Sequence, residues 1–466
     1  MNYGIAIACV VLAGLAPAQE QLAKVSFVCD QRVEFLTALA RTAGFPEFAQ
    51  KGEPSPYQRA VDEWLAPHRT HEAVKRLQGL RREHGTGYDA LASLALHLTS
   101  APAFAELAPF DTAPERLDAR WKPAPTRHFL EALRSLWKDA DGAKFFASQV
   151  GVLAAAEKSL SARLANCNAP AWLKSYCGSN ATVPCRVIAG LLCGTMNYGC
   201  GVRIKDFEEL NPVLGCESFD AEGTPLFSGA AVPLYVHELA HSFVNPLVDD
   251  CWSSLEGTAE KLFAESAPAL RAQAYTTPRV TMCETLVRML VLRWMAENDP
   301  RGAAVQLDED ASRGFVWLRE CVGAFDAYER GRATWPTLKA FMPRISAVLA
   351  REAERLTVLS AAAPKLVRIH PASGTSDVDS SLDTLTIEFD RPMQGASYSI
   401  VGSRTDAPAI NGAPLLSEDG RTFKFPMRLA PGKQYSFGLN SPKSTGFRSA
   451  DGAPLKPLTI RFKTKA

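Results

Sequence analysis

The sequence predicts a multidomain α+β protein, in which a mainly helical domain with a small sheet is followed by an all-β domain. Three observations support this class. The chain has 466 residues, enough for two to three domains. Apolar residues recur at helical spacing from residue 19 to about 160 and again from 231 to about 358. After residue 364, cysteine disappears and short segments of alternating polar and apolar residues take over.

The composition is typical of a globular protein with a substantial core. Hydrophobic residues make up 47% and charged residues 22% of the chain. The formal net charge is only +1, so no large basic surface is expected and nucleic acid is not an expected partner. Beyond the N-terminus, no stretch of about 18 apolar residues occurs, so we expect no membrane span. Function must therefore come from local sites.

Residues 1–18 resemble a secretory signal peptide. An apolar run at 5–15 precedes Ala16-Pro17-Ala18, a small-residue pattern that predicts cleavage after Ala18. No Lys or Arg precedes the run, so a buried N-terminal helix is the alternative. The pattern favours export from the cytoplasm.

The chain contains eleven cysteines, and ten remain once Cys9 is removed with the signal peptide. No C-x-x-C occurs, which argues against a zinc ribbon or a thioredoxin-like redox pair. An even number in an exported chain predicts some disulfides, densest between residues 167 and 251. Buried thiols in a cytosolic protein are the alternative.

The predicted metallopeptidase-like domain, residues 19–360, begins with helices and continues with a small sheet. In "RVEFLTALARTAGF", Val33, Leu36 and Leu39 share one helical stripe, and "HEAVKRLQGLRREHG" and "YDALASLALHLTS" repeat the pattern. From about 182 to 210, apolar and β-branched runs are broken by glycines in "VPCRVIAGLLCGTMNYGCGVRI". This predicts two strands with a tight connection, followed by helices over about 230–300.

The C-terminal part, residues 364–466, has the pattern of a β-sandwich. Six short alternating segments follow one another: "LVRIH", "LTIEF", "SYSIV", "RTFKF", "KQYSFGL" and "LTIRFKT". Turn signals separate them, namely Asp419-Gly420, Pro431-Gly432 and Asp451-Gly452. The stretch "IEFDRPM" (387–393) resembles the bacterial Ig-like modules of surface-layer (SbsA) type, over most of 364–464.

The stretch "VPLYVHELAHSF" (232–243) carries the pattern H-E-x-x-H. On a helix, His237 and His241 lie on one face, so both imidazoles can reach one metal ion. Glu238 is rotated about 100° from His237 and can point at a metal-bound water without coordinating the metal. Zinc suits this set, because it accepts nitrogen and carboxylate ligands and keeps a position open for water. The metal lowers the pKa of that water toward about 7, and Glu238 takes its proton.

The motif is predicted to lie on a helix over about 230–244. Pro233 fits the first turn, and Asn245-Pro246 supplies a stop. The helix is apolar almost all round, which implies burial, and buried histidines and a buried glutamate need partners. A metal supplies a partner for all three. The alternative is a pair of core histidines with ordinary hydrogen-bond partners.

A third ligand must be acidic, because no histidine lies between 241 and 370. Val244 and Leu247 exclude the extended H-E-x-x-H-x-x-G-x-x-H pattern. We favour Glu284, which lies within the long apolar helical pattern "VTMCETLVRMLVLRWMAEN", where a carboxylate is costly unless paired. Arg288 could pair with it instead of a metal, or could orient it as a metal ligand. The other candidates are Asp249, Asp250, Glu256, Glu260, Glu265 and Glu297.

His237, Glu238, His241 and Glu284 together resemble the gluzincin metallopeptidases. The stretches "HELAHSFVNP", "CETLVRML" and "RVEFLTALARTAGF" are more closely similar to a bacterial family of exported HExxH proteins, named as a domain of unknown function, over about residues 24–345. The resemblance implies zinc bound by His237, His241 and Glu284, with Glu238 as the general base. It implies no substrate.

Peptide hydrolysis also needs a donor for the oxyanion, often a tyrosine. Tyr235 lies two residues before His237, about 200° round the helix, and is excluded. Tyr198 and Tyr275 stay open. The strand containing "NYGCGVRI" is glycine-rich, and as an edge strand it could pair with an extended peptide.

We therefore expect a secreted or periplasmic bacterial zinc peptidase that acts on a peptide or protein. Its C-terminal domain is expected to contact the cell surface or a polysaccharide. One alternative is a non-catalytic, zinc-containing surface binding protein, which a closed site with four protein ligands would favour. Another is a zinc hydrolase that acts on a cell-wall amide or an ester.

Overall fold

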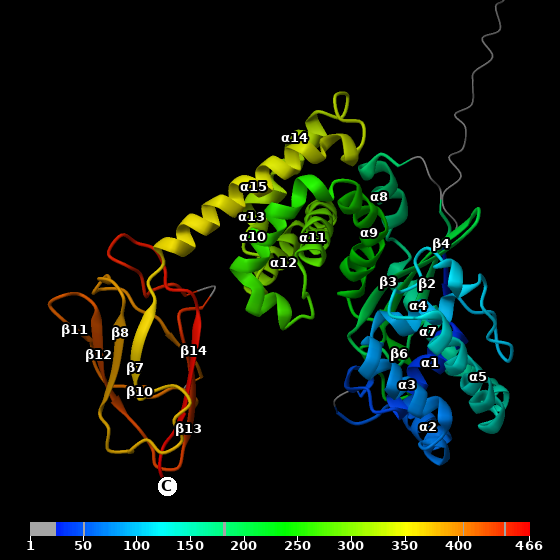
Figure 1. Ribbon diagram of the computed structural model, residues 1–466, viewed down its shortest axis with the longest axis horizontal. Coiled ribbons are helices and arrows are strands. Elements are labelled where there is room, and N and C mark those ends of the chain that lie inside the picture. The colour runs from blue at the N-terminus through cyan, green and yellow to red at the C-terminus, as the bar shows by residue number, and fades with distance from the viewer. Residues whose placement is uncertain (1–24, 50–51, 180–182, 404, 442–443) are drawn as a thin grey trace, which may run out of the picture. The chain divides into compact units, whose positions relative to one another are not determined.

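The computed structural model describes residues 25–49, 52–179, 183–403, 405–441 and 444–466 (Figure 1). The predicted signal peptide, residues 1–18, lies outside them. The α+β class is confirmed: about half of the chain is helical, several sheets are small, and the C-terminal region is rich in strands. The chain divides into two compact units, residues up to 239 and residues from 240 onward.

The first unit contains the predicted series of helices. Helix α1 starts where the Asp30 side chain accepts the N–H of Arg32, and it buries Val33, Leu36 and Leu39 completely or almost so. Its apolar stripe therefore faces the core. The helices are α1 (Gln31–Thr42), α2 (Pro56–Leu65), α3 (Glu72–His84), α4 (Asp89–Leu96), α5 (Pro123–Asp139), α6 (Gly142–Ser148), α7 (Val150–Leu164) and α8 (Ala169–Cys177).

A four-stranded sheet in the order β1-β2-β4-β3 completes the first unit. The two predicted strands are β2 (Cys185–Gly190) and β3 (Asn197–Ile204). The sequence interpretation missed β1 (Val25–Val28), which pairs with β2 in parallel. It also ended the sheet too early, because β4 (Phe207–Gly215) continues beyond 210 and a short pair follows, β5 (Ser218–Phe219) and β6 (Pro225–Leu226).

Strand β3 forms one edge of this sheet and pairs with β4 alone. Leu210 of β4 donates its N–H to Pro184, directly before β2. Successive residues of a strand direct their backbone groups to opposite sides. Asn211 therefore faces β3, where its partner is Cys200. The backbone groups of Gly199 consequently point away from β4, toward the open edge.

The second unit contains a group of helices followed by the C-terminal strands. Helix α11 begins where the Thr277 side chain caps the N–H of Val280, and it is buried almost all round from Thr281 to Leu292. In the described part of the chain, no helix combines the length and the apolarity that a bilayer crossing requires. The helices are α10 (Trp252–Arg271), α11 (Pro278–Asn298), α12 (Pro300–Ser312), α13 (Leu318–Val322), α14 (Ala324–Arg330) and α15 (Leu338–Ala362).

Helix α9 (Ala231–Asp250) contains the H-E-x-x-H motif and is longer than predicted. The predicted stop at Asn245-Pro246 is wrong, because the helix continues through Pro246. A proline costs a helix one N–H bond and crowds the preceding turn. Here Pro246 is exposed, while Leu247 and Val248 are buried. The packing of those two side chains offsets the lost bond.

The C-terminal strands form two sheets around one core, drawn in yellow to red in Figure 1. Each of the six predicted segments contains a strand. The strands are β7 (Leu366–His370), β8 (Thr384–Phe389), β9 (Ile400–Val401), β10 (Ala409–Ile410), β11 (Leu415–Leu416), β12 (Thr422–Arg428), β13 (Gln434–Leu439) and β14 (Leu458–Lys463). One sheet has the order β10-β12-β8-β7, with β11 also on β12, and the other has the order β14-β13-β9. Phe389 and Phe423 from the first sheet share the core with Phe437 and Phe462 from the second.

The structure assigns no disulfide to the ten cysteines that it describes, contrary to the prediction that some pair. Seven of them are buried, including Cys185, Cys193 and Cys200 in the sheet region. Buried thiols pack as small apolar side chains. Burial raises the pKa of Cys185 to about 12, so this thiol is held in its neutral form.

Candidate metal centre

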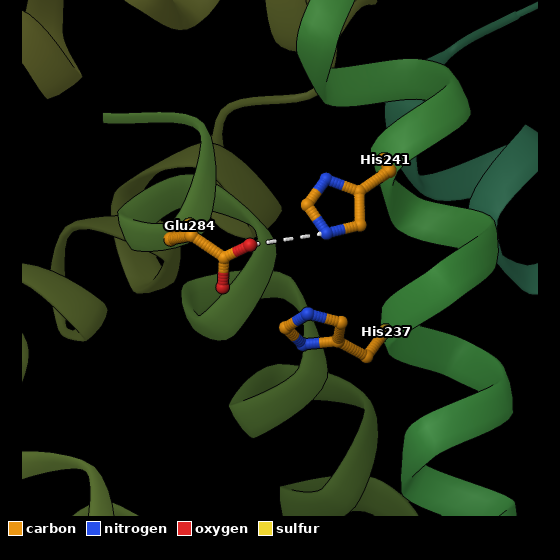
Figure 2. A group of neighbouring side chains, drawn as sticks. All are labelled: His237, His241 and Glu284. Atoms are coloured by element: carbon orange, nitrogen blue, oxygen red, sulfur yellow. Dashed lines mark ion pairs between the residues drawn. The ribbon is translucent and has the colours of Figure 1, made fainter. Parts of the chain in front are cut away.

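Helix α9 presents both histidines of the motif on one face, as the spacing predicted. Figure 2 shows the rings of His237 and His241 one turn apart, both projecting from α9 toward Glu284. Both side chains are half-buried. The residues that precede the two histidines, Val236 and Ala240, are completely buried. The helix therefore cannot rotate without exposing apolar surface. Packing thus fixes the direction of both rings.

Glu284 approaches these rings from α11. Its Oε1 lies 3.3 Å from Nε2 of His241. One nitrogen of each histidine and one carboxylate oxygen of Glu284 all lie within 4.8 Å of one another, and no second group of this kind occurs in the described residues. The structure therefore brings together the three predicted ligands, although Glu284 lies about 40 residues beyond the two histidines in sequence. That they hold a metal stays a prediction.

The spacing and chemistry of the group fit a zinc ion. Two imidazole nitrogens and one carboxylate oxygen are ligands that zinc prefers, at about 2.0–2.2 Å. Two tetrahedral ligands at that distance are about 3.4 Å apart. The 3.3 Å between His241 and Glu284 is close to this separation.

Asn245 supports His241 on the side away from Glu284. Its Oδ1 lies 3.2 Å from Nδ1 of His241, one turn further along α9. A hydrogen bond at Nδ1 places the ring proton there and leaves Nε2 with a lone pair for a metal. The sequence interpretation took Asn245 as part of a helix stop. Its spacing of four residues from His241 was the signal that could have identified it.

The two oxygens of Glu284 have different partners. Oε1 faces His241, whereas Oε2 accepts a hydrogen bond of 3.3 Å from Arg288. Arg288 also donates to Asp310 at 2.6 Å and to the hydroxyl of Tyr275 at 3.1 Å. Burial lowers the pKa of Arg288, but the charges of Glu284 and Asp310 outweigh it and raise that pKa. The ion pair with Arg288 therefore leaves one oxygen of Glu284 facing the histidines.

Glu238 is buried on α9 and is not part of the group of three. Within the first unit, its carboxylate lies near strand β3. Burial raises the pKa of the Cys200 thiol on β3, and the charges of Asp89 and Glu238 raise it further. Glu238 thus follows His237 directly on α9 and lies outside the group of three, and its role as a general base stays a prediction.

The three tyrosines considered as oxyanion donors differ in their surroundings. Tyr235 is buried with its hydroxyl 3.7 Å from Sγ of Cys185, so its exclusion agrees with the structure. The hydroxyl of Tyr198 donates to the sulfur of Met196. Burial raises the pKa of Tyr275, and the charge of Glu284 and a hydrogen bond to it raise it further. Tyr275 therefore supports Glu284, and its hydroxyl is committed to that carboxylate and Arg288.

The remaining acidic candidates for the third ligand lie outside the group. Asp249 pairs with Arg279, and Asp250 pairs with Lys339. The Glu265 side chain pairs with a lysine as well. Glu256, Glu260 and Glu297 are exposed. Of the acidic candidates in the described part of the chain, Glu284 is the one that lies with the two histidines.

A hollow of about 820 Å³ lies over α5, α6 and α7 of the first unit. It is lined by Trp137, Phe146 and Val150 among others, and none of the predicted site residues belongs to it.

Comparison with known proteins gives a family but no activity. The family described as "Domain of unknown function (DUF4932)" matches residues 26–348. No curated protein matches the chain. Among solved structures, CopC from Methylosinus trichosporium OB3b is 14% identical, with 22% of this chain and 93% of that chain covered and a TM-score of 0.17. Domains 1–6 of the surface layer protein SbsC are 16% identical, with 54% of this chain and 35% of that chain covered and a TM-score of 0.17.

Proposed function

The chain belongs to the DUF4932 family, and we propose that it is an exported zinc-dependent peptidase. One observation carries the proposal: His237, His241 and Glu284 converge with their ligand atoms within 4.8 Å of one another. A group of two imidazoles and one carboxylate leaves a zinc ion one open position, as hydrolytic sites require. Glu238, which follows His237 on α9 and lies outside this group, would supply the general base that hydrolysis also requires.

In the proposed mechanism, each residue has one task. His237, His241 and Glu284 would hold the zinc, which when bound polarises the scissile carbonyl and acidifies a water molecule. The carboxylate of Glu238 takes a proton from the attacking water and passes it to the nitrogen of the departing amine. Asn245 keeps Nε2 of His241 available, and Arg288 holds Oε2 of Glu284.

The open edge of β3 favours a peptide as the substrate. Gly199 is exposed and directs its N–H and C=O away from β4. Gly201, two residues on, has the same backbone direction but is buried beside the Arg116 side chain. Gly199 has no side chain that would hinder an approaching backbone, so the proposed pairing is at this residue. Strand β3 also lies near Glu238, whose charge acts on Cys200. We infer that an extended peptide pairs with this edge while its scissile bond lies beside Glu238.

The terminal regions suggest where the enzyme acts. We propose that residues 1–18 direct export and are removed, because their pattern is that of a signal peptide. We also propose that residues 364–466 form an Ig-like module that contacts the cell surface or a polysaccharide. The two sheets with a common core and the "IEFDRPM" motif support that identity.

The test of the proposal is hydrolysis of a mixed peptide library by the zinc-loaded chain, with products identified by mass spectrometry. We expect cleavage at peptide bonds, loss of cleavage when a chelator removes the metal, and recovery when zinc is returned. A small ester and a cell-wall muropeptide are assayed in parallel. Turnover of either one in place of every peptide would contradict a peptidase, as would the absence of any turnover by a fully loaded chain.

A pair of variants at Gly199 tests the role of the β3 edge. Gly199→Pro removes the outward N–H, and a proline is tolerated on an edge strand when that N–H faces solvent. Losing one hydrogen bond of about 1 kcal/mol predicts a roughly fivefold lower kcat/KM for peptides. Gly199→Ala keeps the N–H and is the matched control, with kcat/KM near that of the wild type. Equal kcat/KM for wild type and Gly199→Pro would exclude pairing at this residue.

A further inference from the structure

We propose that Asp310 is a positioning residue for the metal ligand Glu284 and that it acts through Arg288. The inference rests on the proposed metal site but concerns residues that do not bind the metal. Asp310 lies on α12 and its side chain is 1% exposed. A buried carboxylate at this position needs a cationic partner, and Arg288 of α11 provides one at 2.6 Å.

The guanidinium of Arg288 is held in one orientation. Nη1 donates to Asp310, and Nη2 donates both to Tyr275 and to Oε2 of Glu284. Its centre also lies 4.4 Å from the centre of the Phe315 ring, a cation–π distance. Contacts on both ends and one face leave the group little freedom. Arg288 therefore holds Oε2 of Glu284, while Oε1 faces His241.

Asp310 also balances the positive charge of Arg288. Arg288 alone would compete with a divalent ion for the negative charge of Glu284, and the two cations would repel each other across the carboxylate. Asp310 neutralises Arg288 from the side away from Glu284. The guanidinium then orients the ligand while most of the carboxylate's charge stays available to the metal.

Gln306 keeps the Asp310 carboxylate in place for this task. Its side-chain amide, one turn earlier on α12, donates to Oδ1 of Asp310 at 3.1 Å. This hydrogen bond orients the Asp310 carboxylate independently of Arg288. A series of hydrogen bonds therefore joins Gln306 to Asp310, Asp310 to Arg288, and Arg288 to Glu284.

The experiment measures zinc affinity of the full chain by competition with a chromophoric chelator, and unfolding temperature in parallel. Loss of a partner behind a metal ligand weakens binding by about 10- to 100-fold. We expect Asp310→Asn to weaken zinc binding by this amount. Asp310→Asn combined with Arg288→Met should bind no more weakly than Arg288→Met alone, because Asp310 acts only through Arg288.

The matched control is Asp249→Asn, which removes an exposed Arg–Asp pair between α9 and α11 and should leave zinc affinity unchanged. If Asp310→Asn lowers the unfolding temperature but keeps wild-type zinc affinity, Asp310 is structural only and the proposal is overturned. Should Asp310→Asn not fold, Asp310→Leu with Arg288→Met removes both charges and must still bind zinc more weakly than the wild type. A wild type that binds no zinc would instead contradict the metal site itself.

Discussion

Replacing Glu238 with glutamine is expected to abolish turnover while zinc stays bound. The amide has the size of the carboxylate but cannot accept a proton from water, and general-base catalysis contributes about 10²- to 10⁴-fold in rate. We therefore predict a kcat that is lower by at least about 100-fold. Zinc content should remain at the wild-type level, because Glu238 lies outside the group of three ligands. Peptide hydrolysis and elemental analysis of the same preparation provide both measurements.

The control for this variant is Glu256→Gln, an identical change at an exposed glutamate of α10. It should match the wild type in zinc content, unfolding temperature and kcat. Glu238 is 8% exposed, so its replacement by a neutral amide removes a buried charge and should not unfold the chain. Wild-type turnover by Glu238→Gln would end the assignment of the general base.

The second large effect is expected for Glu284→Ala, which removes the third ligand. Two imidazoles from one helix turn would then hold the ion alone. We expect zinc affinity to fall by more than about 100-fold, beyond the loss typical of an outer partner. The apo chain should still fold, because Arg288 keeps its ion pair with Asp310. Chelator competition measures the affinity, and circular dichroism measures the fold.

Glu260→Ala is the matched control, since Glu260 is an exposed acid that the sequence left as a candidate ligand. It should bind one zinc as tightly as the wild type. If Glu284→Ala retained full zinc affinity and Glu260→Ala lost it, the ligand assignment would have to move to α10. Equal affinity in all three proteins would show that no carboxylate among these candidates completes the site.

The convergence of His237, His241 and Glu284 was largely predictable, because these residues are local or chemically conspicuous. The spacing of His237 and His241 fixes their common face on any helix. Glu284 is conspicuous as an acid within an apolar helix. Asp310 was not predictable, because it lies beside Asp308 and Glu309 in a polar stretch of α12. Only tertiary packing buries Asp310 and places it against Arg288.

The elements that the sequence did not predict depend on distant partners. Strand β1 has four residues, and its partner β2 lies some 160 residues later, so no local pattern marks it. Pro246 is a strong local stop signal, yet α9 continues beyond it because Leu247 and Val248 pack in the core. Strands β8, β12, β13 and β14 were predictable because one face of each is buried, which imposes the alternation read from the sequence. Strands β10 and β11, with two residues each, are too short to carry that alternation.

The central claim is an open zinc site made by two imidazoles and one carboxylate. Zinc-edge X-ray absorption of the wild-type chain, loaded with one equivalent of zinc, tests it most directly. We predict two imidazole nitrogens and two oxygens around the ion, at about 2.0–2.2 Å, one oxygen from Glu284 and one from water. The oxygen assigned to Glu284 should be lost in Glu284→Ala. A sulfur at about 2.3 Å, or a shell that is unchanged by Glu284→Ala, would contradict the account.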